Sequence, residues 1–262
     1  MKLNNILTEL EWIGSLSLSD EFCKTYDAYD NSGVIIKCNE SVSGVLFSLD
    51  LSHKAIKKAK SLGCNLIVTH HPPIFHPIKK LDAVSSPAVS VVPECIKEGI
   101  SVISMHLNFD VAPQGIDYYL MKGLGGNGKD YLTHLQIGSG AYGRVYEIEP
   151  QNFSEYFDAV KKTFSSERAI CFGKDKLIKR VASFCGAGCD ADAIEFAYKS
   201  RADVFVSADM REHEIATLLA NGINVIELTH YSSENYGFNK IYQFLKGKLK
   251  VPAEYFCDDQ LL

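Results

Sequence analysis

The chain has 262 residues, 46% of them hydrophobic, which is enough apolar side chain for one large domain or two closely packed lobes. A formal net charge of −5 argues against general nucleic-acid binding, because such binding needs a basic surface to displace counterions from phosphates. No window approaches the roughly 18 consecutive apolar residues of a membrane span, and no N-terminal pattern predicts a signal peptide. The eight cysteines lie mostly alone in apolar segments, and Cys185 and Cys189 lack a second pair for a zinc knuckle, so we expect reduced thiols in the cytoplasm.

Apolar periodicity predicts strands that alternate with helices along the whole chain. The predicted elements, in chain order, are a helix around 55–59, strands over 65–68, 100–104 and 144–148, helices over 153–164 and around 193–197, and strands over 204–207 and 224–228. Alternation of this kind predicts βαβ units and mainly parallel sheets. Because most of these strands are nearly continuous in apolar character, we expect helices on both faces of each sheet.

Two stretches of the chain share one pattern. Ala55–Ala59 precedes Leu66–Thr69 at the same spacing as Ala193–Ala197 precedes Val204–Ser207. Further on, Gly99-Ile100-Ser101-Val102-Ile103 matches Gly222-Ile223-Asn224-Val225-Ile226. The pattern predicts an internal duplication, that is, an α/β fold with two similar lobes. We expect a first lobe over residues 1–125, a short connector with a strand and a helix over 126–177, and a second lobe over 178–262, together forming one domain.

Histidine and carboxylate side chains follow four of the predicted strands. His70 and His71 precede Pro72-Pro73, His106 and Asp110 follow the strand over 100–104, His213 follows the strand over 204–207, and His230 and Glu234 follow the last strand. In parallel α/β sheets ligands collect beyond the carboxyl ends of the strands. The residues therefore predict a site at that edge.

The residue types at these strand ends favour a metal site. Zinc, manganese and iron all prefer neutral imidazole and carboxylate ligands. A lone histidine after a strand is more often a capping or solvated residue, so the convergence of several strand ends carries the prediction. His230 and Glu234 are four residues apart and would share a helix face, from which the glutamate could bridge two ions.

At these residues the sequence resembles the GTP cyclohydrolase I type 2 homologue family, also called Nif-three-like proteins. The matching stretches are Asp30-Asn31-Ser32-Gly33, Thr69-His70-His71-Pro72, His106-Leu107-Asn108-Phe109-Asp110, Ser207 to His213, and Thr229-His230-Tyr231-Ser232-Ser233-Glu234. The resemblance implies two intertwined lobes with a metal site between them at the strand ends, and a homo-oligomer, commonly a hexamer. It also implies two divalent metal ions held by His70, His71, Asp110, His230 and the bridging Glu234. Three histidines and two carboxylates suit zinc, manganese or iron alike, so the sequence does not identify the native metal.

The resemblance implies a metal-dependent hydrolase that opens the imidazole ring of GTP with metal-activated water. His213 or His106 is the candidate proton donor to the leaving nitrogen, although either could instead orient a ligand. Two alternatives remain open. The same site could serve a phosphoesterase or amidohydrolase, or the protein could be a metal-binding scaffold without turnover.

Glycine-rich strings suggest nucleotide binding elsewhere, but they fit poorly. Gly123–Asp130 lacks the Ser or Thr that follows the lysine of a P-loop, and it follows a predicted helix rather than a strand. Cys185–Asp190 resembles a structural turn between a strand and a helix, with phosphate binding by its backbone amides as the open alternative. We expect no organic cofactor.

Overall fold

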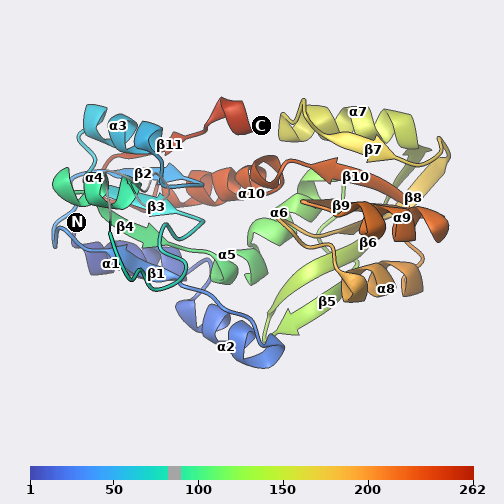
Figure 1. Cartoon of the computed structure of the whole chain (residues 1–262), viewed down its shortest axis with the longest axis horizontal. Helices are drawn as coiled ribbons and strands as arrows, with labels where there is room; N and C mark the ends of the chain where they lie inside the picture. The colour runs from blue at the N-terminus through green and yellow to red at the C-terminus, as the bar shows by residue number, and fades with distance from the viewer. Residues whose placement is uncertain (82–89) are drawn as a thin grey trace. The chain divides into compact units, whose positions relative to one another are not determined.

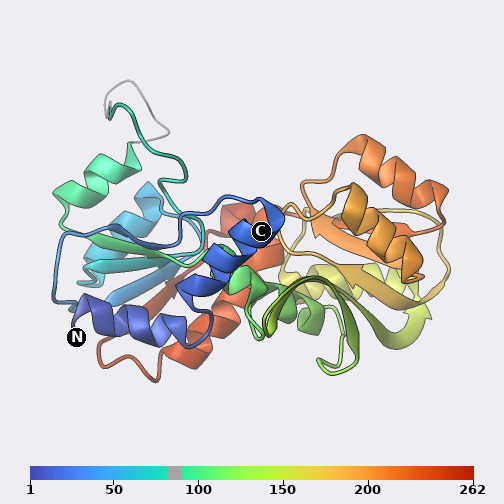
Figure 2. The same cartoon turned by 90° about the horizontal axis from the view of Figure 1, so that it is seen from below.

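The computed structural model describes residues 1–81 and 90–262 and divides the chain into two compact units, drawn with their elements in Figures 1 and 2. The first unit comprises Met1–Ala112 and Phe238–Cys257, and the second comprises Pro113–Gly237 and Asp258–Leu262. The chain thus builds most of the first unit, forms most of the second, returns to complete the first, and ends in the second. Among the described residues, no helix has the length and apolar character needed to cross a membrane.

The first unit contains a five-stranded sheet in the order β1-β4-β3-β2-β11. Its elements are α1 (Leu3–Glu11), α2 (Leu16–Tyr26), β1 (Gly33–Ile36), β2 (Val45–Ser48), α3 (His53–Ser61), β3 (Leu66–Thr69), α4 (Val91–Lys97), β4 (Ser101–Ser104), α5 (Leu107–Val111) and β11 (Ala253–Phe256). Strands β11, β2, β3 and β4 are parallel, and β1 pairs antiparallel with β4. This sheet is therefore mainly parallel, as predicted.

Alternating strand residues of the first unit face two different helical layers. Leu46 of β2 and Ile67 of β3 pack in a core with Ala55 and Ile56 of α3, on the sheet face that α3 and α4 cover (Figure 2). Phe47 points the other way, where its ring lies 5.3 Å from that of Tyr242. All four strand residues from Val45 to Ser48 are buried. Burial on both faces explains why the strand sequence is continuously apolar rather than alternating.

The second unit contains a six-stranded sheet in the order β5-β6-β8-β9-β10-β7. Its elements are α6 (Ile116–Gly123), β5 (Tyr131–Ile137), β6 (Gly140–Asn152), α7 (Phe153–Phe164), β7 (Ile170–Phe172), β8 (Leu177–Ser183), α8 (Ala191–Lys199), β9 (Val204–Ala208), α9 (Glu212–Ala220), β10 (Asn224–Leu228) and a 3-10 helix at Asp259–Leu261. Strands β8, β9 and β10 are parallel, with antiparallel β6 and β5 on one side and antiparallel β7 on the other. Residues 126–177 thus supply β5, β6, α7 and β7 to this unit.

Helices also cover both faces of the second sheet. On one face, Ala182 and Phe205 pack with Ile194 of α8 and Leu218 of α9 in a buried core (Figure 1). Helix α7 lies on the opposite face, where Phe153, Tyr156, Val160 and Phe164 are buried at helical spacing. The spacing of these apolar residues is the pattern from which the helix over 153–164 was predicted.

The two units repeat one order of elements, which agrees with the predicted duplication. In each, an antiparallel edge strand is followed by strand, helix, strand, helix, strand and a further helix: β1 to α5 in the first unit and β7 to α10 (His230–Leu245) in the second. The first repeated helix is capped in the same way in both. Ser52 accepts a hydrogen bond from the Ala55 amide, and Asp190 accepts one from the Ala193 amide. The carboxyl ends of β3, β4 and β10 lead directly into the predicted metal ligands.

Candidate metal centre

The histidines of the first unit lie immediately beyond β3 and β4. The backbone amides of His70 and His71 both donate to the Leu49 carbonyl oxygen, at 3.0 and 3.1 Å, which holds the turn after β3 against the end of β2. His106 is the N-cap residue of α5, and its carbonyl oxygen accepts from the Asp110 amide at 3.1 Å. The short helix therefore carries Asp110 back toward the strand end that bears His106.

These side chains form a group that could hold a divalent cation. One ring nitrogen from each of His70, His71 and His106 lies within 4.8 Å of the others. His70 Nε2 also lies 3.4 Å from Asp110 Oδ1. The His70 side chain is fully buried and Asp110 nearly so, whereas His71 and His106 are partly exposed. The group is thus accessible from one side and enclosed on the other.

Hydrogen bonds fix the orientation of each of these imidazoles. Nδ1 of His71 donates to Asp50 at 2.7 Å, and Nδ1 of His106 donates to Asp30 at 2.7 Å. Nδ1 of His70 donates to the Met105 carbonyl oxygen at 2.8 Å. A histidine held by Nδ1–H presents the lone pair of Nε2, which is the usual arrangement of a metal-ligating imidazole. The donor set and its orientation both fit a transition-metal site.

A second ligand pair lies in the second unit at the end of β10. His230 and Glu234 share one face of α10, with His230 Nε2 3.1 Å from Glu234 Oε1. Nδ1 of His230 donates to Asp209 at 2.5 Å, repeating the pattern of the first unit. Asp209 follows β9 in the left-handed region, at φ 50°.

Two carboxylates govern the protonation of His230. Burial by itself would lower its pKa, but the hydrogen bonds and charges of Glu234 and Asp209 outweigh burial and raise the pKa to about 9. A divalent cation and a proton therefore compete for the same imidazole.

The turn after β8 packs against the side chains of His230 and Glu234. Gly186 has φ +57°, and a Cβ built on it would lie 2.4 Å from Glu234 Oε1 and 3.2 Å from His230 Nε2. Its amide donates to Ser233 Oγ at 3.0 Å, and the Gly188 amide donates to Ser207 Oγ at 3.2 Å. Because these two amides already donate to side chains, the structure favours a structural turn here over the phosphate-binding alternative.

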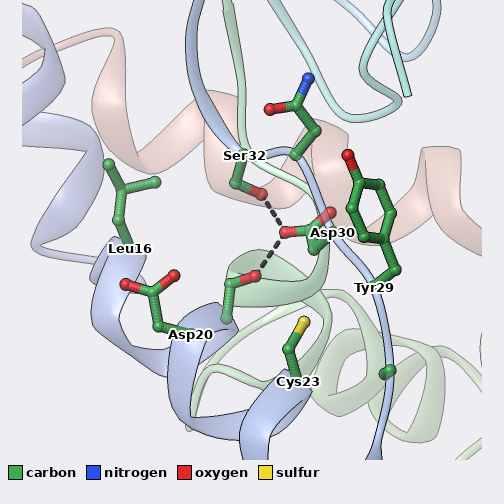
Figure 3. A pocket seen from close by; sticks show the side chains of 9 residues that line it. Leu16, Asp20, Cys23, Tyr29, Asp30 and Ser32 are labelled. Carbon is green, nitrogen blue, oxygen red and sulfur yellow. Dashed lines mark hydrogen bonds between the residues drawn. The ribbon is translucent and has the colours of Figure 1, made fainter. Parts of the chain in front are cut away.

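Asp30 lines a pocket of about 330 Å³ beside α2, shown in Figure 3. Its carboxylate accepts hydrogen bonds from Ser19, from Ser32 at 2.6 Å and from His106. Burial disfavours the charged carboxylate, but these hydrogen bonds and the charge of His106 outweigh burial and lower the pKa of Asp30 to about 2. Asp30 is therefore a fixed anion behind the His106 ring.

The structure places the two candidate proton donors, His106 and His213, in different surroundings. His106 joins His70 and His71, whereas His213 is exposed in the first turn of α9, and its role stays a prediction. Sequence reasoning assigned no role to the three orienting carboxylates, Asp30, Asp50 and Asp209. Asp209 follows β9 directly and Asp50 lies two residues after the end of β2, so their position beyond a strand end was the available signal.

The chain is similar in sequence to several curated proteins. A curated Clostridium perfringens protein named "GTP cyclohydrolase 1 type 2 homolog" is 27% identical, covering 99% of this chain and 97% of its own. A Campylobacter jejuni protein of the same name is 32% identical, covering 90% and 88%. A Helicobacter pylori protein named "GTP cyclohydrolase 1 type 2" is 28% identical over 79% of each chain.

Solved structures and a family model extend the likeness to nearly the whole chain. A Staphylococcus aureus protein superposes with a TM-score of 0.82 at 22% identity, covering 99% of this chain and 97% of its own. Reduced HcgD from Methanocaldococcus jannaschii superposes with a TM-score of 0.77 at 25% identity, covering 97% of each chain. The model of the Duf34/NIF3 (NGG1p interacting factor 3) family matches residues 13–258. This chain belongs to the Duf34/NIF3 family.

Proposed function

We propose that the protein is a dinuclear metal-dependent hydrolase of a nucleotide or related heterocycle, with opening of the GTP imidazole ring as its reaction. One observation carries the proposal. At the strand ends, imidazoles whose Nδ1 atoms donate to oxygen acceptors lie next to the carboxylates of Asp110 and Glu234. The Helicobacter pylori relative is named for this activity, and the other curated relatives are named as its homologues.

The proposed ligands are His70, His71, Asp110, His230 and Glu234, of which Glu234 would bridge two ions as the family resemblance implies. Imidazole and carboxylate donors in these proportions suit zinc, manganese or iron. The homohexamer and the cytoplasmic location stay predictions.

Divalent cations in such a centre supply Lewis-acid polarisation and a water molecule activated as a nucleophile. The protein's own groups do the rest. Asp50, Asp209 and the Met105 carbonyl hold the imidazoles in place, and the carboxylates of Asp110 and Glu234 balance the cationic charge. His106 keeps a proton on Nδ1 through its bond to Asp30, so its Nε2 can take up or deliver a proton beside the leaving nitrogen.

Product analysis by liquid chromatography and mass spectrometry tests the proposal. Protein loaded with zinc, manganese or iron, with its metal content measured, is incubated with GTP beside the Asp110→Ala variant. We expect formate and a ring-opened triphosphate from the wild type. The variant should lose activity at least about 100-fold, since even the loss of a group that only orients a metal ligand typically costs about 10- to 100-fold.

Glu21→Ala is the matched control, because this carboxylate is exposed on the same unit and lies outside both the ligand group and the pocket beside α2. Metal-loaded wild type that yields no product from GTP would contradict the assignment. Turnover of a phosphodiester or an amide instead would indicate a phosphoesterase or an amidohydrolase. Tight metal binding without any turnover would indicate a metal-binding scaffold.

A further inference from the structure

Three aromatic side chains of the first unit cluster next to the metal-binding histidines. The Tyr29 ring lies 5.2 Å from the Phe75 ring, edge to face at 82°, and 4.8 Å from the His76 ring. Phe75 and His76 are 4.9 Å apart. We call Tyr29, Phe75 and His76 the aromatic shelf. Tyr29 remains 48% exposed and Phe75 37% exposed, so the rings hold one another in place while presenting surface to solvent.

The shelf rests on a fixed base. Asn31 Nδ2 donates to the Ile74 carbonyl oxygen at 2.5 Å, which ties the loop after Pro72-Pro73 to the segment leading into β1. The Ile74 side chain packs against the buried core beneath α3 and α4. Large aromatic rings held in order at the surface, rather than folded into the adjacent core, are typical of a recognition surface.

The position of the shelf connects it with the candidate centre. The Phe75 ring meets the His106 ring edge to face, with centroids 5.9 Å apart. The His106 ring lies 5.0 Å from that of His70. Tyr29 also lines the pocket of about 330 Å³ shown in Figure 3. This volume is near the lower end of the range of about 300–1,000 Å³ for small-molecule sites.

We propose that the aromatic shelf stacks the planar heterocyclic ring of the substrate and so presents that ring to the His106 side of the centre. This inference rests on the proposed function and adds the residues that recognise the base. The shelf offers aromatic faces and contains no lysine or arginine, so it suits a base rather than a phosphate group. Stacking of a base on an aromatic side chain contributes about 1–3 kcal/mol, or about 5- to 150-fold in affinity.

Calorimetric titration of the zinc-loaded protein with guanosine tests the shelf, with tripolyphosphate as a probe that has no ring. We expect Tyr29→Leu and Phe75→Leu each to weaken guanosine binding about tenfold, because each removes a stacking face and keeps apolar volume. Tyr29→Phe, which retains the ring, should bind as the wild type does. Tripolyphosphate affinity and bound zinc should be unchanged in all variants.

Phe244→Leu is the matched control, because Phe244 is an exposed aromatic residue on α10 in the same unit and outside the shelf. Saturation-transfer NMR supplies a second readout, in which the base protons of guanosine receive magnetisation from the wild type and much less from the two shelf variants. The inference is overturned if guanosine, adenosine and neopterin all fail to bind the wild type, or if the leucine variants bind them as tightly.

The two hypotheses fail in different ways. Shelf-dependent binding of guanosine without turnover of GTP would contradict the proposed reaction and support base stacking on the aromatic shelf. Turnover of GTP with KM unchanged in Tyr29→Leu and Phe75→Leu would contradict base stacking on the aromatic shelf and support the proposed reaction.

Discussion

At the scale of single residues, an oxygen acceptor at Nδ1 orients each imidazole of the candidate centre. The sequence shows the histidines because they follow apolar strands and stand beside prolines or at four-residue spacing. It does not show their partners, since His71 is oriented by a residue 21 positions away and His106 by one 76 positions away. Asp50 and His71 become neighbours because the parallel strands β2 and β3 end at one edge of the sheet. Asp30 reaches His106 because β1 begins at that edge, antiparallel to β4.

Gly186 gives a prediction at this scale. Gly186→Ala should lower metal affinity about tenfold or more, because its Cβ would displace Glu234 and His230. Gly222→Ala is the matched control: Gly222 also has a positive φ, but no atom lies within 4 Å of its added Cβ. Both variants should lose about 1 kcal/mol of stability from backbone strain. Metal affinity is measured by competition with a chromogenic chelator. Equal affinity in the two variants would show that the close packing of Gly186 against Glu234 and His230 does not affect metal binding.

Asp30 gives a prediction about pH. Its folded pKa of about 2 lies below the ordinary value of 3.8, so its ionisation stabilises the fold above about pH 4, and this contribution is lost as pH falls toward 2. Asp30→Asn should cost about 2 kcal/mol at neutral pH, and the difference from wild type should fall to about half by pH 3. Urea unfolding of chelator-treated protein measures both, with Asp20→Asn as the exposed control. A pH-independent difference would show that the charge of Asp30 is not what stabilises the fold.

At the scale of elements, a buried ion pair joins α6 to the sheet and to the turn that contains Gly186. Asp117 of α6 accepts hydrogen bonds from the Arg144 guanidinium, from the Gly143 amide at 3.0 Å and from the Cys185 amide at 3.1 Å. Arg144 is 1% exposed, with Cζ 5.5 Å from the centre of the Tyr131 ring. The pair therefore helps to position the turn against which Glu234 rests.

The two members of this pair should contribute to stability non-additively. Arg144→Leu leaves the buried Asp117 carboxylate without its guanidinium, and we expect a loss of about 3–5 kcal/mol in the free energy of unfolding. The double variant Arg144→Leu/Asp117→Asn should lose less than the sum of the two single variants, as a double-mutant cycle from urea unfolding would show. Additive losses would mean that the two side chains stabilise the unit independently.

At the scale of the whole molecule, the chain is discontinuous in its first unit. Residues 238–257 return to the first unit after residues 113–237 have formed most of the second. They supply β11, which pairs parallel with β2 from Val45↔Ala253 to Ser48↔Phe256. The repeated order of elements explains why two stretches of the sequence match. The sequence match between Leu66–Thr69 and Val204–Ser207 corresponds to β3 and β9, which hold equivalent places in the two sheets.

The sequence by itself determined the alternation of strands and helices, the duplication and the strand-end histidines, because periodicity and strand ends are properties of neighbouring residues. It also contained the motifs that place the chain in its family. Only the tertiary structure decided that β11 completes the first sheet, that β7 flanks β10, and that Asp30, Asp50 and Asp209 orient the imidazoles. These pairings depend on which distant segments the packed core brings together, and no local pattern along the chain records that choice.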